Sequence, residues 1–207
     1  HDAIRVLMLG DSVTFGLAKT TYPKVASEIL SKMGQDVEVI NGGVEGYSAK
    51  NVLLELPRYQ SIKPDVVTIM IGWNDIYFES QWSRSVYRNL GIVWAANQIL
   101  DKGRRIFSTP SKEMATLHVR RDKVNKQDPD IADALAYQHR SLKEVGRIVE
   151  ALQKNGSKVV ILTLVGLYLD DEAPSDRALE IGHLPRHTSN PYVLASLVKA
   201  YNKGLQR

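Results

Sequence analysis

The sequence predicts an α/β fold, a three-layer α/β/α sandwich around a mainly parallel sheet. Three observations support this prediction. Short β-rich runs alternate with amphipathic helical patterns, an order typical of βαβ crossovers. The runs are almost continuously apolar, as in strands that are buried on both faces of a parallel sheet. Small polar segments that contain glycine follow the first three runs, and ligands bind at that edge of such sheets.

Four strands are expected, because four short runs are rich in β-branched and other apolar residues. They are IRVLML at 4–9, VEVI at 37–40, VVTIMI at 66–71 and VVILTLV at 159–165.

Four helices are expected between and after these strands, over 22–33, 49–56, 130–154 and 191–206. Thr21 and Ser48 are suitable N-caps for the first two. The first should bury a stripe that includes Val25, Ile29 and Met33. Pro57 is expected to close the second helix, and the third is expected to run without a break to Asn155-Gly156.

The chain is interpreted as one domain, residues 1–207, with an insertion at about 76–129. A length of 207 residues suits a single hydrophobic core. The insertion is inferred because no core strand is evident there, and a structureless loop of that length would be unusual. Part of it, 82–102, shows a helical pattern. We expect the insertion to lie over or beside the carboxyl edge of the sheet.

Charge and composition narrow the possible partners. The formal net charge is +4, yet residues 102–126 alone carry eight basic and two acidic side chains. Such a segment is either a solvated surface or an attractant for an anionic partner. Aromatic residues are not regularly interleaved with these charges, so nucleic acid is not an expected partner. No apolar run approaches the roughly 18 residues of a membrane span. The oligomeric state stays open, and so does the compartment, cytoplasmic or exported.

The segments that follow the first three strands carry the candidate chemistry. Taken singly, Ser12 could be a helix cap, Gly46 a turn glycine and Asn74 another cap. Because parallel strands end at a common edge, all three should instead meet there. A serine hydroxyl beside neutral N–H donors suits acyl transfer. Asp11 is expected to tie down the loop. The segments are GDSVTFG at 10–16, NGGVEGYS at 41–48 and GWND at 72–75.

Together these segments resemble the SGNH hydrolases, also called the GDSL esterase/lipase family. The resemblance is clear over residues 4–75 and looser over 130–207. It implies a flavodoxin-like SGNH-hydrolase fold and a carboxylic ester hydrolase. Ser12 would be the nucleophile and one oxyanion donor through its N–H, with the Gly46 N–H and the Asn74 amide as the others.

The resemblance also implies which molecules this chain binds. The expected substrate is a small-molecule or glycan ester that carries a short acyl or acetyl group. No cofactor and no metal are expected. The alternative is a catalytically incomplete module that binds an acylated glycan or a protein partner.

The serine also needs a base, and the family's Asp-x-x-His block is not found in this sequence. Three explanations stay open. The favoured one is that the chain stops before the fold's last strand and helix, which predicts an unpaired sheet edge near the fourth strand. In the second, Glu180 and His183 form a relocated acid–base pair, with His187 as a weaker candidate. In the third, the domain lacks the pair by nature. His118 and His139 are expected at the surface.

Overall fold

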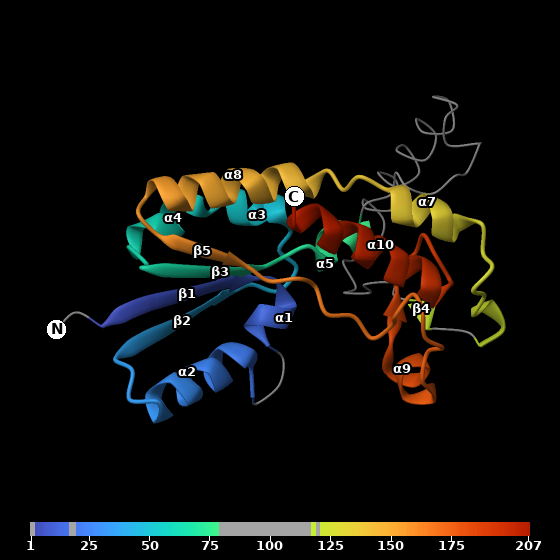
Figure 1. The fold of residues 1–207 in the computed structure, drawn as a ribbon, viewed down its shortest axis with the longest axis horizontal. Helices are drawn as coiled ribbons and strands as arrows, with labels where there is room; N and C mark the ends of the chain where they lie inside the picture. The colour runs from blue at the N-terminus through green and yellow to red at the C-terminus, as the bar shows by residue number, and fades with distance from the viewer. Residues whose placement is uncertain (1–2, 17–19, 79–116, 119–120) are drawn as a thin grey trace, which may run out of the picture. The chain divides into compact units, whose positions relative to one another are not determined.

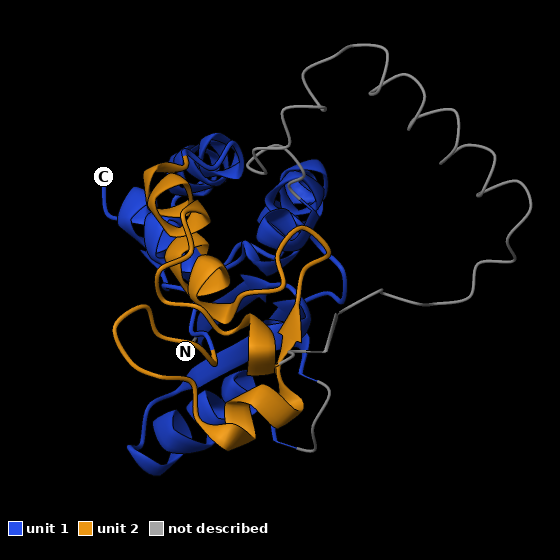
Figure 2. Ribbon diagram, turned by 90° about the vertical axis from the view of Figure 1, so that its right-hand side faces the viewer, with its two compact units in different colours: residues 1–78, 138–166, 198–207 blue, residues 79–137, 167–197 orange. Residues whose placement is uncertain are grey.

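The computed structural model describes residues 3–16, 20–78, 117–118 and 121–207. The chain divides into two compact units, which Figure 2 shows in different colours. Unit 1 comprises residues 1–78, 138–166 and 198–207, and unit 2 comprises 79–137 and 167–197. Most of the predicted insertion, with the helical pattern at 82–102, lies outside the described residues. The single-domain organisation stays a prediction.

Unit 1 is built on four parallel strands in the order β2-β1-β3-β5. β1 lies between β2 and β3, and its last residue, Gly10, pairs with Gly43 on one side and Met70 on the other. The fold class and the four strands predicted from the sequence are therefore confirmed. The strands are β1 (Ile4–Gly10), β2 (Val37–Gly43), β3 (Val66–Met70) and β5 (Lys158–Ile161).

Helices cover the sheet of unit 1 from both sides. Figure 1 shows α3, α4 and α8 along one face and α1 and α2 along the other. The helices that lie entirely in unit 1 are α1 (Ser12–Phe15), α2 (Tyr22–Lys32), α3 (Ala49–Leu54), α4 (Leu56–Ser61), α5 (Trp73–Phe78) and α8 (Ser141–Lys154). The last helix, α10 (Pro191–Leu205), begins in unit 2 and ends in unit 1.

Unit 2 is organised around a buried asparagine. The Asn190 amide donates to the Asn125 carbonyl at 2.6 Å and to the Asp128 carboxylate at 2.9 Å, which ties the loop before α7 to the start of α10. The other described elements of this unit are β4 (Leu117–His118), η2 (Arg121–Lys123), α7 (Asp130–Ala136), α9 (Asp176–Ile181) and β6 (His183–Leu184), with β4 and β6 antiparallel. Among the described helices of both units, none is long and apolar enough to cross a membrane.

The helix caps lie where the sequence predicts them, but two helix ends differ from the prediction. The Thr21 side chain accepts from the Lys24 N–H, and Ser48 forms a capping box with Asn51. Pro57, expected to close a helix, instead lies in the first turn of α4, where the missing N–H of proline costs nothing. The predicted helix over 130–154 is broken into α7 and α8, because Tyr137 is extended, with φ −68° and ψ 132°.

One face of the sheet carries the core of unit 1. Its buried side chains come from the two central strands, from Ile71 directly after β3, and from the helices α3, α4 and α8. This arrangement removes a large apolar area from water. The members are Leu7, Leu9, Ala49, Val52, Leu56, Tyr59, Val67, Ile69, Ile71, Val145, Ile148 and Leu152.

The other face is less covered. The stripe on α2 that the sequence predicts as buried stays substantially exposed, at 37% for Val25, 52% for Ile29 and 65% for Met33.

β5 is the last strand in the sheet order, and Val160 on it is 47% exposed. Within the described part of the chain no further strand pairs with β5, so the predicted sheet edge is confirmed there.

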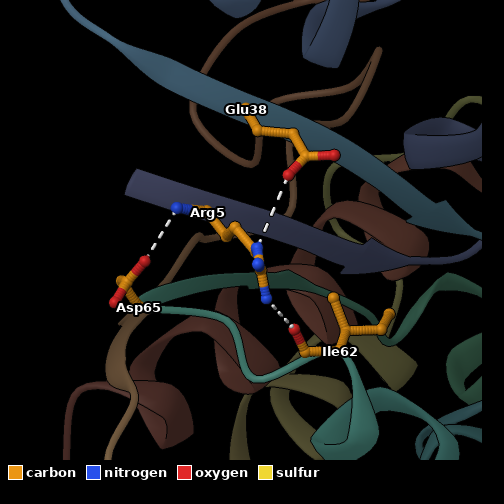
Figure 3. A network of polar contacts seen from close by, with 4 residues as sticks. All are labelled: Arg5, Glu38, Ile62 and Asp65. Atoms are coloured by element: carbon orange, nitrogen blue, oxygen red, sulfur yellow. Dashed lines mark hydrogen bonds and ion pairs between the residues drawn. The ribbon is translucent and has the colours of Figure 1, made fainter. Parts of the chain in front are cut away.

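Arg5 links three segments at the amino ends of the strands, as Figure 3 shows. Its backbone N–H donates to the Asp65 carboxylate at 2.8 Å, and its guanidinium donates to the Ile62 carbonyl at 3.0 Å. The same guanidinium lies 3.6 Å from the Glu38 carboxylate on β2. These contacts help align β1, β2 and β3 at the end opposite the glycine-rich loops.

Gly43 gives a test of how closely α1 is seated on the sheet. A Cβ at this position would overlap the backbone nitrogen of Phe15, and backbone cannot move aside as a side chain can. We expect Gly43→Ala to lower the free energy of unfolding by about 1–3 kcal/mol. Urea unfolding followed by circular dichroism measures this.

The matched control is Gly146→Ala in α8, where a Cβ would meet nothing within 4 Å. There the higher helix propensity of alanine should raise stability by up to about 1 kcal/mol. Equal effects of the two substitutions would contradict the packing argument.

Candidate active site

Ser12 is the first residue of α1, directly after the carboxyl end of β1. Asp11 precedes it as N-cap, and its Oδ1 accepts from the Val13 N–H at 3.0 Å. A Cβ at Gly10 would overlap the Thr14 hydroxyl and the Met70 carbonyl oxygen. The glycine therefore lets the short helix and the end of β3 pack directly against the end of β1. Ser12 itself is half-buried, at the sheet edge where the sequence predicts it.

Gly46 lies in the turn between β2 and α3. Its φ is +79°, a conformation that residues with a side chain rarely adopt. The turn is joined to the end of β1, because the Val44 N–H donates to the Gly10 carbonyl at 3.1 Å. A Cβ at position 46 would meet no atom within 4 Å, so lack of space does not require a glycine here. The positive φ does.

Asn74 lies in the first turn of α5, after the carboxyl end of β3. Its Nδ2 donates to the Tyr47 carbonyl at 2.9 Å. The next residue, Asp75, accepts from the Ala49 N–H at 3.0 Å through its carboxylate. Two adjacent side chains thus join the turn after β3 to the turn after β2. The three predicted segments converge at one edge of the sheet.

Asp75 is a residue whose role the sequence analysis missed. Its carboxylate meets the first residue of α3, so it positions the turn that contains Gly46. The only available signal was its place beside Asn74 in the GWND segment, which is equally typical of a helix cap.

Asp11 is the buried charge of this region, with no exposed surface. Burial raises the pKa of its carboxyl above the ordinary value, and hydrogen bonds from the backbone N–H groups of Val13 and Trp73 partly offset that effect. The expectation that Asp11 ties down the loop is confirmed by its capping bond to Val13.

The raised pKa of Asp11 makes stability depend on pH. Below the ordinary carboxyl range the group is protonated in both the folded and the unfolded chain. As pH rises above about 4, the unfolded chain loses this proton first, so the wild type loses stability until pH passes the raised folded value. Asp11→Asn keeps an N-cap acceptor but cannot ionise. We therefore expect its free energy of unfolding to increase relative to wild type over this pH range, as measured by urea titrations. A difference that does not change with pH would contradict the assignment.

The residues proposed as a relocated acid–base pair lie in unit 2. Glu180 is on α9, and its carboxylate is paired with the Arg177 guanidinium at 2.8 Å, with both side chains largely exposed. His183 begins β6 and is exposed, and its backbone pairs with His118 of β4. His187 follows in the next turn. Ser12, Gly46 and Asn74 all belong to unit 1.

His139 differs from the expectation of a surface histidine. It lies between α7 and α8, within unit 1, and is only 4% exposed. Its ring meets the ring of Tyr201 edge-on, with centroids 5.2 Å apart and planes at 82°. No local sequence pattern indicates this burial, because it depends on the break between the two helices.

Comparison with known protein families gives a match over most of the chain. A sequence model of the GDSL-like lipase/acylhydrolase family matches residues 8–207. The chain belongs to this family. The resemblance noted from the GDS, NGGVEG and GWND segments is thereby confirmed.

An arylesterase from Vibrio mimicus is 37% identical to this GDSL-family chain over 75 residues, which are 34% of the chain and 38% of that protein. The match thus spans well under half the length of this relative.

Solved structures that match this chain include TesA, at 15% identity and a TM-score of 0.46, with 96% of this chain and 94% of TesA covered. They also include the acetyl xylan esterase AlAXEase, at 16% identity and a TM-score of 0.39, covering 97% of this chain and 98% of its own. The SGNH-hydrolase family esterase AlinE4 covers 77% of this chain and 76% of its own, at 18% identity and a TM-score of 0.39.

Proposed function

We propose that this GDSL-family chain hydrolyses carboxylic esters through an acyl-enzyme formed on Ser12. The Ser12 Oγ attacks the ester carbonyl carbon, and the alcohol leaves with a proton as the acyl group stays on the serine. Water then attacks the acyl-enzyme. Its oxygen and one hydrogen leave in the carboxylic acid, and its other proton returns to the Ser12 Oγ. In both steps the oxyanion is held by three neutral N–H donors, the backbone N–H groups of Ser12 and Gly46 and the side-chain amide of Asn74.

The observation that carries this proposal is the hydrogen bond from Asn74 Nδ2 to the Tyr47 carbonyl, 2.9 Å long. A carboxamide has two N–H donors. This bond uses one of them and fixes the plane of the amide, so the other projects in a defined direction. A donor that is fixed before reaction stabilises developing charge without reorganisation. Because Tyr47 follows Gly46, the same bond holds the Gly46 turn beside Asn74.

Family resemblance and local chemistry support the choice of substrate. The Vibrio mimicus relative is named an arylesterase, and Asn74 is flanked on α5 by Trp73 and Tyr77, whose rings meet edge-on with centroids 6.1 Å apart. Half-buried aromatic side chains of this kind suit the ring of an aryl or sugar alcohol. We propose an acetyl or other short acyl ester of such an alcohol.

The base that accepts the Ser12 proton is a separate question. An imidazole base is usually oriented by a carboxylate, but the Glu180 carboxylate is already paired with Arg177 at 2.8 Å. This contact does not favour Glu180 and His183 as the acid–base pair.

Ser12→Ala tests the nucleophile. We expect hydrolysis of p-nitrophenyl acetate to fall to the uncatalysed background and labelling by a fluorophosphonate to disappear, because both need the Ser12 Oγ. Unchanged hydrolysis would reject Ser12 as the nucleophile. If the wild type neither hydrolyses esters nor is labelled, the alternative of a ligand-binding module is favoured.

Asn74→Ala tests the oxyanion donor. Because the amide stabilises charge that exists only in the transition state, we expect kcat to fall by about 10²–10³ with little change in KM. Asn155→Ala is a matched control, since the Asn155 amide also donates to a main-chain carbonyl, that of Gln60 at 3.4 Å. It should leave kcat unchanged. Equal losses in the two variants would contradict the assignment.

His183→Ala separates the explanations for the base. A relocated pair requires it to abolish hydrolysis as completely as Ser12→Ala does, because the serine would keep its proton. We expect hydrolysis of p-nitrophenyl acetate to persist in His183→Ala. Its complete loss, with the thermal midpoint unchanged, would instead establish His183 as the base.

A further inference from the structure

Tyr201 reaches the turn that carries Asn74 from a distant part of the sequence. It lies on α10 and is fully buried. Its hydroxyl donates to the Ile71 carbonyl at 2.8 Å. Ile71 is the first of the two residues that connect β3 to α5, three residues before Asn74. The hydroxyl therefore holds the peptide group on which this turn begins.

Gly72 shows how tightly the ring is seated on that turn. Its φ is +138°, and a Cβ built there would lie 2.5 Å from Cζ and 2.7 Å from the hydroxyl oxygen of Tyr201. The ring thus lies against the bare backbone of the glycine. The Gly72 carbonyl accepts from the Ile76 N–H at 2.9 Å, the first hydrogen bond of α5. Any shift of the Ile71–Gly72 peptide would therefore be passed to the first turn of α5, which contains Asn74.

Neighbouring contacts fix Tyr201 itself. The His139 ring meets it edge-on. The next residue, Asn202, bonds to both backbone groups of Leu164, accepting from its N–H at 2.8 Å and donating to its carbonyl at 2.9 Å. A Cβ at Gly204 would overlap the Leu142 side chain. The end of α10 is thus held at the segment after β5 and at α8, so Tyr201 has little freedom to move.

We propose that Tyr201 is a positioning residue for ester hydrolysis, which orients the Asn74 amide through its hydrogen bond to Ile71 and its packing on Gly72. This inference rests on the proposed function of Asn74 as an oxyanion donor. The Tyr47 carbonyl fixes the rotation of the amide, and Tyr201 fixes the main chain from which the amide projects. Both are needed, because a catalytic group works only within about 0.5 Å of its productive position.

Tyr201→Phe tests the proposal, since it keeps the ring and removes only the hydroxyl. We expect kcat for p-nitrophenyl acetate to fall by about tenfold with KM unchanged, because a displacement well below 1 Å weakens the oxyanion bond without altering ground-state binding. The matched control is Tyr168→Phe. It also removes a buried hydroxyl that donates to a main-chain carbonyl, that of Ala178 at 3.2 Å, but in unit 2.

Thermal unfolding of both variants separates positioning from general stability. The two substitutions should lower the melting temperature by similar amounts, while only Tyr201→Phe lowers kcat. A Tyr201→Phe enzyme with wild-type kcat would overturn the proposal. So would an equal loss of kcat in Tyr168→Phe, since the effect would then follow from stability alone.

A double-mutant cycle shows whether Tyr201 acts through Asn74. In the Asn74→Ala background, Tyr201→Phe should lower kcat by less than about twofold, because the group it positions is absent. A full tenfold loss in that background would overturn the proposal and leave the oxyanion assignment intact. An Asn74→Ala enzyme with wild-type kcat would overturn the oxyanion assignment itself, and the role of Tyr201 with it.

Discussion

The structure of unit 1 depends on close main-chain contact at the carboxyl ends of β1, β2 and β3. Three glycines permit it. Gly10 lets Thr14 and the end of β3 approach, Gly43 receives the backbone of Phe15, and Gly72 receives the ring of Tyr201. Side chains at these positions would hold the loops apart by roughly the width of a methyl group. The small spacing matters because hydrogen bonds such as that from Asn74 to Tyr47 form only over a narrow range of distance.

Two carboxylates take part in the polar contacts at this edge, those of Asp11 and Asp75, and both accept from main-chain N–H groups. The oxyanion donors that we propose are amides, and Tyr201 meets a main-chain carbonyl. The buried carboxyl of Asp11 caps α1 by accepting from the Val13 N–H. Neutral donors that are fixed before reaction stabilise the charge that develops on the substrate.

Much of this arrangement is readable from the sequence, because it follows from local signals. The four strands appear as apolar runs, and the caps Thr21 and Ser48 precede their helices as expected. The convergence of the Ser12, Gly46 and Asn74 segments follows from parallel strand order alone. What could not be read depends on contacts distant in sequence. Tyr201 lies 130 residues from Ile71, and nothing near either residue indicates the pairing.

The break between α7 and α8 was missed for a related reason. Apolar periodicity continues across it. The break occurs at the extended Tyr137, and no glycine or proline adjoins this residue to indicate a helix end. The helix predicted over 22–33 forms, but its apolar stripe is not buried as predicted. Periodicity indicates which face of a helix is apolar and not whether another element covers that face. Burial of His139 depends in turn on that same break.

The exposed edge of the sheet bears on how this molecule would behave on heating. β5 is the last strand in the sheet order, and Val160 and Ile161 on it are 47% and 37% exposed. An apolar strand edge of this kind is a template for pairing with another chain. Loss of folded protein on heating should therefore have a kinetic order above one in protein concentration. A larger fraction of the protein should then stay folded in dilute samples than in concentrated ones.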